Sequence, residues 1–364
     1  YLVILKRDKR EMLTMEKFDA FINEWMMKIA SLFDPMDFSM RNCSITMGPP
    51  SAREFLTHLQ AYQRVLLTIA GTFTGFVLLL ALIHWYHIWT FISDEKRQNK
   101  LYFLISLFPV STICCLIGMG APRTSLMISS LGLLYFLTCL FVLVSLIRNL
   151  FGSRDSFSIT LKYDQRPINF QSPPFCCCCF CLPKVNSNPK NLRRVEWLVL
   201  QAPIVRAVIV TFNIVAVIEF REDTEKYVHM SEMVAVGSLL LAVFGVHTMA
   251  RLTSDKLSHY GFMTIFRIVD IALLFFTAQQ PMLFENILIR FGVFNCGPML
   301  NAQENARFIC NFVIICEMLF LSIIASIFVA PSRSALFDLY HSRGSHLASP
   351  LTEDSILTPD EGSP

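Results

Sequence analysis

Charged side chains are scarce in this chain. Asp, Glu, Lys and Arg together make up 16% of its 364 residues, whereas hydrophobic residues make up 54%. A soluble chain of this length would form two or three domains, but long runs without charge indicate a membrane protein. The formal net charge of +3 is small and spread over the loops, so it indicates neither a nucleic acid nor an acidic partner.

Motifs of common enzyme chemistries are also missing. The chain has no P-loop, GxSxG, HExxH or zinc-finger pattern, so we expect no enzyme activity, no catalytic residues and no cofactor. It starts at Tyr1 rather than at Met, and its first apolar residues precede the basic residues from Lys6, the reverse of a signal peptide. We therefore expect the natural N-terminus to lie further upstream.

Seven apolar runs are long enough to cross a bilayer as helices, which takes about 20 residues. The sequence therefore predicts an all-α membrane protein with seven transmembrane helices. Residues 1–64 form an N-terminal region, 65–330 the transmembrane domain with a cysteine-rich loop at 148–194, and 331–364 a disordered tail. The predicted spans are Val65–Ile92, Leu101–Met119, Ser125–Ile147, Val195–Ile218, Met233–Ala250, Phe262–Ile287 and Phe308–Ala330.

Basic residues predict the orientation. An odd number of spans places the two termini on opposite sides of the membrane. With the N-terminus extracellular, the cytoplasmic connections hold fifteen Lys and Arg residues and the extracellular connections hold five. The positive-inside rule thus favours an extracellular N-terminus and a cytoplasmic C-terminus.

The two terminal regions carry local signals. Residues 12–33 place apolar side chains at helical spacing and predict an amphipathic helix on the membrane domain or the lipid interface. Asn42 starts the sequon Asn-Cys-Ser and is the predicted glycosylation site on the extracellular side. The polar tail has Ser-Pro and Thr-Pro sequences among acidic residues, so we expect a disordered segment open to phosphorylation.

Five of the twelve cysteines cluster between the third and fourth spans. Neighbouring cysteines do not pair readily, and their spacing lacks the C-x₂₋₄-C pattern with further ligands, so neither a disulfide framework nor a metal site is predicted. Cysteines beside a span, flanked by Phe, Pro and basic residues, are typical of S-palmitoylation, which would hold the loop on the cytoplasmic leaflet. The predicted sites are Cys176, Cys177, Cys178, Cys179 and Cys181.

Three further cysteines, Cys43, Cys296 and Cys310, are extracellular in this topology. They allow one disulfide and leave one thiol. We favour a Cys296–Cys310 disulfide, with Cys43–Cys296 as the alternative.

Ionisable groups within spans are costly in hydrocarbon and often mark a pathway. Arg267 and Asp270 lie one helical turn apart in the sixth span, which predicts an ion pair between them. Arg206 in the fourth span and Glu317 in the seventh either pair across helices or leave Arg206 as the counter-charge of an anionic substrate. The predicted substrate-binding residues are Arg206, Glu317, Gln279, Gln280, Asp270 and Arg267.

Three other features concern the spans. Pro281, after Gln279 and Gln280, predicts a break in the sixth span that frees carbonyls toward a cavity or a neighbouring helix. Gly71 and Gly75 form a GxxxG pattern that favours internal helix packing, with contact to a second subunit as the alternative. The aromatic and histidine side chains of residues 84–89 predict an interfacial belt rather than a metal site.

Several short stretches resemble the alpha subunit of the organic solute transporter. They are Cys43 with Pro49-Pro50-Ser51-Ala52-Arg53, the cysteine run closed by Pro183, Leu200-Gln201 with Arg206, Ala278-Gln279-Gln280-Pro281, and Ile315-Cys316-Glu317-Met318. The resemblance covers nearly the whole membrane domain and suggests a diverged, invertebrate-type member. It implies seven spans, an extracellular N-terminus and a single-span beta subunit as partner. It also implies downhill movement of bile acids, conjugated steroids and similar amphipathic anions, without ATP or ion coupling.

We therefore expect a facilitative transporter subunit that moves amphipathic organic anions or sterol-like solutes across the plasma membrane. One alternative is a membrane organiser or trafficking subunit that transports nothing, which the cysteine cluster and the tail would suit. A seven-span receptor is the other alternative, but the third span ends without Asp-Arg-Tyr and the seventh lacks Asn-Pro-x-x-Tyr. Topology alone does not separate these functions.

Overall fold

The computed structural model describes residues 49–152, 188–219, 224–294 and 296–340, together with residues 156, 159, 168, 185 and 186. The predicted amphipathic helix at 12–33, Asn42, Cys43, the five clustered cysteines and residues 341–364 lie outside this part. Within it the chain is helical, and its only β pairing is an isolated bridge between Ile168 and Val185.

Seven stretches of the described chain are long and apolar enough to cross a membrane, which confirms the predicted fold class. The second stretch joins α4 and α5, and the sixth joins α10 to a π-helix, η4. Two 3₁₀ turns, η1 (Pro122–Thr124) and η3 (Ser258–Tyr260), lie in connections. The helices are α2 (Ala52–Thr57), α3 (Ala61–Phe91), α4 (Glu95–Ile105), α5 (Leu107–Gly120), α6 (Ser125–Leu150), α8 (Pro189–Glu219), α9 (Thr224–Thr253), α10 (Phe262–Ala278), η4 (Gln279–Leu288) and α11 (Ala302–Phe328).

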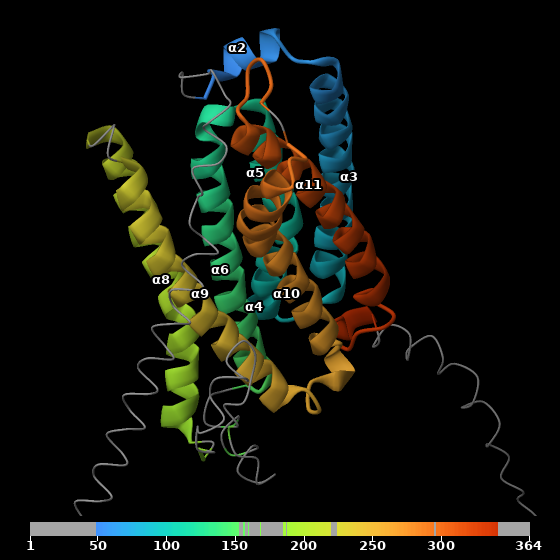
Figure 1. Cartoon of the computed structure of the whole chain (residues 1–364). Helices are drawn as coiled ribbons and strands as arrows, with labels where there is room; N and C mark the ends of the chain where they lie inside the picture. The colour runs from blue at the N-terminus through green and yellow to red at the C-terminus, as the bar shows by residue number, and fades with distance from the viewer. Residues whose placement is uncertain are drawn as a thin grey trace, which may run out of the picture.

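The spans run up and down in one bundle (Figure 1). We call the end that holds α2 and the start of α11 the α2 end, and the end where α4 begins and α11 finishes the α4 end. α11 packs against α3, α5 and α10, while α6 packs against α5, α4 and α8. α8 and α9 form a hairpin whose main support is α6, so it leans out to one side of the bundle.

Prolines explain both interruptions in the spans. Pro109 has no N–H to donate to the carbonyl of Ile105, and the chain turns at Ser106 between α4 and α5. Pro281 lies in η4, where the wider π-helix replaces the α-helix from Gln279 onward. The sixth span therefore changes from α-helix to π-helix beside Pro281, while the chain stays helical as far as Leu288. That carbonyls are freed toward a cavity or a neighbouring helix stays a prediction.

The GxxxG pattern does not pack inside the bundle. A Cβ atom placed on Gly71 or Gly75 would meet no atom within 4 Å among the described residues, so the predicted internal packing is wrong. The reason is the rotation of α3, whose inward face carries Ala70, Val77 and Ala81 instead. Close helix approach occurs at Gly132 of α6, where a Cβ would lie 2.6 Å from the ring of Phe276 in α10.

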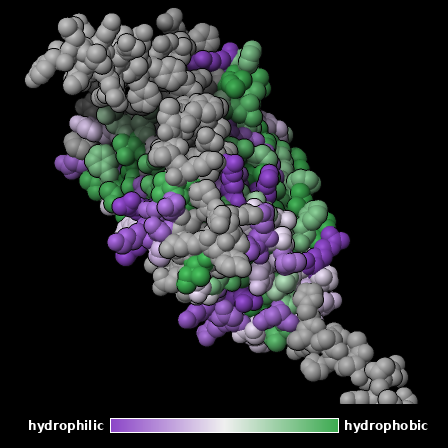
Figure 2. All heavy atoms as spheres, turned by 90° about the horizontal axis from the view of Figure 1, so that it is seen from below, coloured by the Kyte–Doolittle hydropathy of each residue, from purple (hydrophilic) through white to green (hydrophobic). Residues whose placement is uncertain are grey.

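The two ends differ in charge. Figure 2 looks onto the α4 end, where hydrophilic side chains gather. The described basic residues at the α2 end are Arg53, Arg64, Arg123, Lys226, Arg290 and Arg307. Those at the α4 end are Lys96, Arg97, Lys100, Arg148, Lys190, Arg193, Arg194, Arg251, Lys256 and Arg333. This bias supports the prediction that the α4 end faces the cytoplasm.

Candidate functional site

The six residues predicted to bind substrate lie in three separate places. Arg206 of α8 faces α9, Asp270 of α10 contacts α9 one turn from the exposed Arg267, and Gln279, Gln280 and Glu317 lie where η4 meets the middle of α11. The structure thus does not gather them into one charged site. A pocket that the sequence did not predict lies at the α4 end.

Arg206 is held by a carboxylate from the neighbouring helix of its hairpin. Its Nη1 donates to Oε2 of Glu232 in α9 at 2.6 Å, and its Nη2 donates to Oγ of Ser130 in α6 at 3.0 Å. The side chain of Arg206 is 5% exposed and that of Glu232 is 34% exposed. Pairing of Arg206 with Glu317 is therefore wrong. Glu232 was not among the predicted ionisable residues of the spans because the predicted fifth span starts one residue later, at Met233.

Asp270 pairs across helices rather than within its own. Its Oδ2 lies 3.3 Å from Nε2 of His247 in α9, whose ring also meets the edge of Phe266. Arg267 is exposed, and the described ion pairs contain no Arg267–Asp270 contact. The predicted pair within the sixth span is wrong because Asp270 is turned toward α9.

A polar cluster links η4 to the first half and the middle of α11. Nε2 of Gln279 donates to Oε1 of Glu317 at 2.9 Å, and Nε2 of Gln280 donates to Oε1 of Glu285 at 3.0 Å. The same Glu285 oxygen accepts from Nε of Arg307 at 2.8 Å. Oε1 of Gln279 and Oε2 of Glu317 are buried and have no partner among the described residues. This cluster is the one place where predicted site residues meet.

The favoured disulfide is also wrong. Cys310 is a free, buried cysteine within α11, whereas Cys296, in the loop before α11, is disulfide-bonded. Cys310 cannot meet the loop because it lies on the inward face of α11, which packs against α5. The alternative Cys43–Cys296 disulfide stays a prediction, since Cys43 lies outside the described residues.

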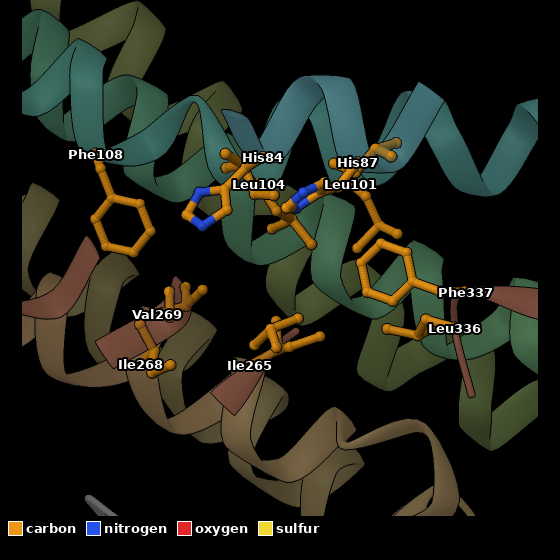
Figure 3. A pocket seen from close by; sticks show the side chains of 14 residues that line it. His84, His87, Leu101, Leu104, Phe108, Ile265, Ile268, Val269, Leu336 and Phe337 are labelled. Atoms are coloured by element: carbon orange, nitrogen blue, oxygen red, sulfur yellow. The ribbon is translucent and has the colours of Figure 1, made fainter. Parts of the chain in front are cut away.

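An apolar pocket lies between α3, α4, α5, α10 and α11 at the α4 end (Figure 3). The pocket is partly open to the exterior. Its polar lining residues are His84 and His87, whose rings project from α3. The apolar lining residues are Ile88, Leu101, Leu104, Ile105, Phe108, Ile265, Ile268, Val269, Ala325, Val329, Leu336 and Phe337.

The two histidines depart from the predicted interfacial belt. Trp89 is 70% exposed and Tyr86 is exposed as well, as a belt requires. His84 and His87 occupy the opposite face of α3 and turn inward. Nε2 of His84 lies 2.8 Å from Oγ of Ser326 in α11, and its Nδ1 is buried without a partner among the described residues.

A short segment after α11 closes one side of the pocket. Residues 334–338, which we call the strap, lie in the region that the sequence assigned to a disordered tail. Leu336 and Phe337 of the strap are buried and line the pocket. Oγ of Ser334 donates to the carbonyl of Tyr260 at 2.7 Å, and Nη1 of Arg97 donates to the carbonyl of Leu336 at 3.5 Å. The strap is therefore tied to the start of α10 and to α4.

Asp338, the last residue of the strap, is hydrogen-bonded to Ser93. It accepts hydrogen bonds from the backbone N–H of Ser93, at 3.0 Å, and from the Ser93 hydroxyl. Desolvation acts to raise the pKa of Asp338, but these hydrogen bonds and the charge of Arg97 outweigh it and hold the pKa below its usual value. A depressed folded-state pKa adds stability above the unfolded-state pKa, and this stability is lost as the pH falls through the folded-state pKa.

Replacing Asp338 by Asn is expected to weaken the strap by roughly 1 kcal/mol, because hydrogen bonds to a charged acceptor are lost. Ser93→Ala should cost a similar amount, and the double variant little more than either, which thermal unfolding of the purified protein measures. The difference between wild type and Asp338→Asn should stay constant from pH 8 to pH 5, begin to shrink near the unfolded-state pKa of about 3.9, and disappear below the lower folded-state pKa. Glu95→Gln, on the exposed first turn of α4, is the matched control. If the double variant lost the full sum of the two single losses of stability, the contact between Asp338 and Ser93 would be contradicted.

Comparisons with known proteins agree on one family. Residues 66–333 match the model of the family described as organic solute transporter Ostalpha. The chain is 57% identical over 312 residues to organic solute transporter alpha-like protein 3 of Caenorhabditis elegans, covering 86% of this chain and 89% of that protein. It is 34% identical over 292 residues to alpha-like protein 1 of the same organism, covering 80% and 75%. No solved structure matches. The chain therefore belongs to the organic solute transporter alpha family.

Proposed function

We propose that this transporter subunit moves amphipathic organic solutes, either anions or sterol-like molecules, across the plasma membrane. The pocket at the α4 end carries the proposal. Its lining is predominantly apolar with a small number of polar groups, as in sites for small organic molecules. Its apolar walls suit a hydrocarbon body, and its two imidazoles offer a polar end. A water-soluble ion or sugar would find few partners there.

Downhill movement needs no energy-coupling machinery, which is consistent with the missing nucleotide-binding motifs. A charged solute faces an obstacle at Arg206, because its head group would have to displace Glu232 from the guanidinium. The role of Arg206 as a counter-charge thus remains a hypothesis that requires the hairpin pair to open. Glu232 is partly exposed, which leaves room for such an exchange.

The proposal includes a partner in the membrane. Gly71 and Gly75 leave open space on the outer face of α3, and small residues allow a second helix to approach closely. A single-span subunit of the beta type would fit this face. Palmitoylation of the five clustered cysteines and glycosylation of Asn42 are part of the same proposal, as both suit a plasma-membrane subunit.

Flux measurements test the proposal. Expressing cells, with and without candidate single-span partners, should take up at least one member of a panel of steroid sulfates, bile salts and neutral sterols. Uptake should saturate, follow the solute gradient and persist without ATP. If no panel member moves and the chain co-purifies stably with another membrane protein, it is an organiser instead.

A further inference from the structure

We propose that the outer face of α8 binds an anionic phospholipid of the leaflet at the α4 end. The head group lies on a basic face formed by Lys190, Arg193 and Arg194, and one acyl chain follows the apolar residues beyond it. The inference goes beyond the proposed transport function and does not depend on it. It concerns the hairpin of α8 and α9, whose main support in the described part of the bundle is α6 (Figure 1).

The basic face occupies the first turns of α8. Its three side chains are exposed, and Lys190 lies three and four residues before the other two, so they share one side of the helix. Glu196, the acidic residue of these turns, is turned the other way. It is buried, and its Oε2 lies 3.3 Å from Nη1 of Arg148 in α6. The exposed side of these turns therefore carries three positive charges and no negative one.

Other basic side chains at this end are balanced, whereas the basic face is not. The charge of Arg97 acts on the nearby carboxylates of Asp94 and Asp338. The ion pairs of the described residues include no member of the basic face. Nη1 of Arg194 donates only to a neutral group, Oδ1 of Asn191, at 3.4 Å. The basic face thus lacks a carboxylate partner in the part of the chain that the structure describes.

An apolar stripe continues the basic face along α8. Trp197 is exposed and lies one helical turn after Arg193 and Arg194. Ile204 and Val208 follow on the same side, seven and eleven residues after the indole, and are exposed as well. We call Trp197, Ile204 and Val208 the lipid stripe. Indole rings prefer the depth of the lipid head groups, so Trp197 places the basic face at the membrane surface.

The lipid stripe has the length of one leaflet. From Trp197 to Val208 the helix rises by roughly 16 Å, at about 1.5 Å per residue. Half of a hydrocarbon core of roughly 30 Å is about 15 Å. A phospholipid whose head group contacts the basic face can therefore lay one acyl chain along the whole stripe.

Charge decides which phospholipid binds. Phosphatidylcholine is zwitterionic, whereas phosphatidylserine has a net negative charge that the basic face would neutralise. Each Lys or Arg near an anionic lipid surface contributes roughly fivefold in affinity. One head group cannot meet three side chains equally well, so we expect a preference of about tenfold for the anionic lipid.

Fluorescence quenching of the purified full chain in lipid nanodiscs tests the inference. Bromine atoms on an acyl chain quench an indole that they touch. The chain has four Trp residues, so the emission of Trp197 is taken as the difference between wild type and Trp197→Phe. Brominated phosphatidylserine should quench it half-maximally at about one tenth of the mole fraction that brominated phosphatidylcholine requires. In 1 M salt, where the Debye length is about 3 Å, the preference should largely disappear.

Variants locate the site. Replacing all three side chains of the basic face by Gln should bring the preference to nearly one. A control variant removes three exposed basic side chains at the same end of the bundle but outside α8, and it should keep the preference. The three are Lys96, Lys256 and Arg333. Trp89 is an exposed indole at the same end with no Lys or Arg within one turn, so its emission should show no preference.

Equal quenching of Trp197 by the two lipids would overturn the inference, as would an equal loss of preference in the two triple variants. Weak quenching by both lipids would show that another chain or segment covers α8, and would overturn it as well. If the basic-face variant has no melting transition, the salt dependence and the contrast with Trp89 decide. A lipid preference without solute flux refutes transport alone, whereas flux without a preference refutes the lipid site alone.

Discussion

Glu232→Ala is expected to lower the free energy of unfolding by roughly 3 kcal/mol, the lower end of the range for breaking a buried ion pair. Its partner Arg206 is 5% exposed in the middle of α8 and keeps its charge when the carboxylate is removed. The lower end applies because Glu232 is 34% exposed, so water screens part of the interaction. Unfolding of the purified protein in detergent, followed by heat or denaturant, measures the loss.

A double variant separates the unpaired charge from lost packing. Arg206→Met with Glu232→Met removes both charges, so it should be markedly more stable than Glu232→Ala. Glu219→Ala, an exposed glutamate at the end of the same helix hairpin, should change stability by less than about 0.5 kcal/mol. If the single and double variants lose the same amount, the pair is not what holds the hairpin.

The seven spans could be predicted from the sequence because a bilayer demands both length and apolarity of every crossing helix. The irregularity at Pro281 could be predicted as well, since proline lacks the N–H that an α-helix needs. Pairings of side chains between helices could not be predicted from the sequence. Arg267 and Asp270 are neighbours in sequence, yet the rotation of α10 relative to α9 places Asp270 next to His247. Only packing sets that rotation.

The pocket could not be predicted from the sequence for the same reason. An apolar side chain such as Val269 has the same sequence signal whether it faces lipid, a neighbouring helix or a cavity. His84 was assigned to the interfacial belt because aromatic residues such as Tyr86 and Trp89 follow it in the sequence. Those two are exposed, but His84 lies on the other face of α3. Leu336 and Phe337 follow the last span in a region that turns polar, so nothing in their sequence context marked them as part of the pocket wall.

Ala325→Trp should reduce solute uptake at least tenfold while leaving the melting temperature nearly unchanged. Ala325 lines the pocket from α11, so an indole ring there would occupy space that the solute needs. Filling existing space does not force core side chains out of their rotamers, which is the usual cost of a larger residue. Initial rates of uptake into proteoliposomes, at matched protein content, measure the effect.

Ile327→Trp is the matched control for this prediction. Ile327 lies two residues further along α11 and is 51% exposed, so its indole ring would point away from the bundle. Wild-type uptake by Ala325→Trp would show that solutes bypass the pocket. An equal loss in both variants would place the effect on the surface of α11. A loss confined to Ala325→Trp would mean that the solute passes between α3, α4, α10 and α11, because these helices, together with α5, enclose the space that the indole fills.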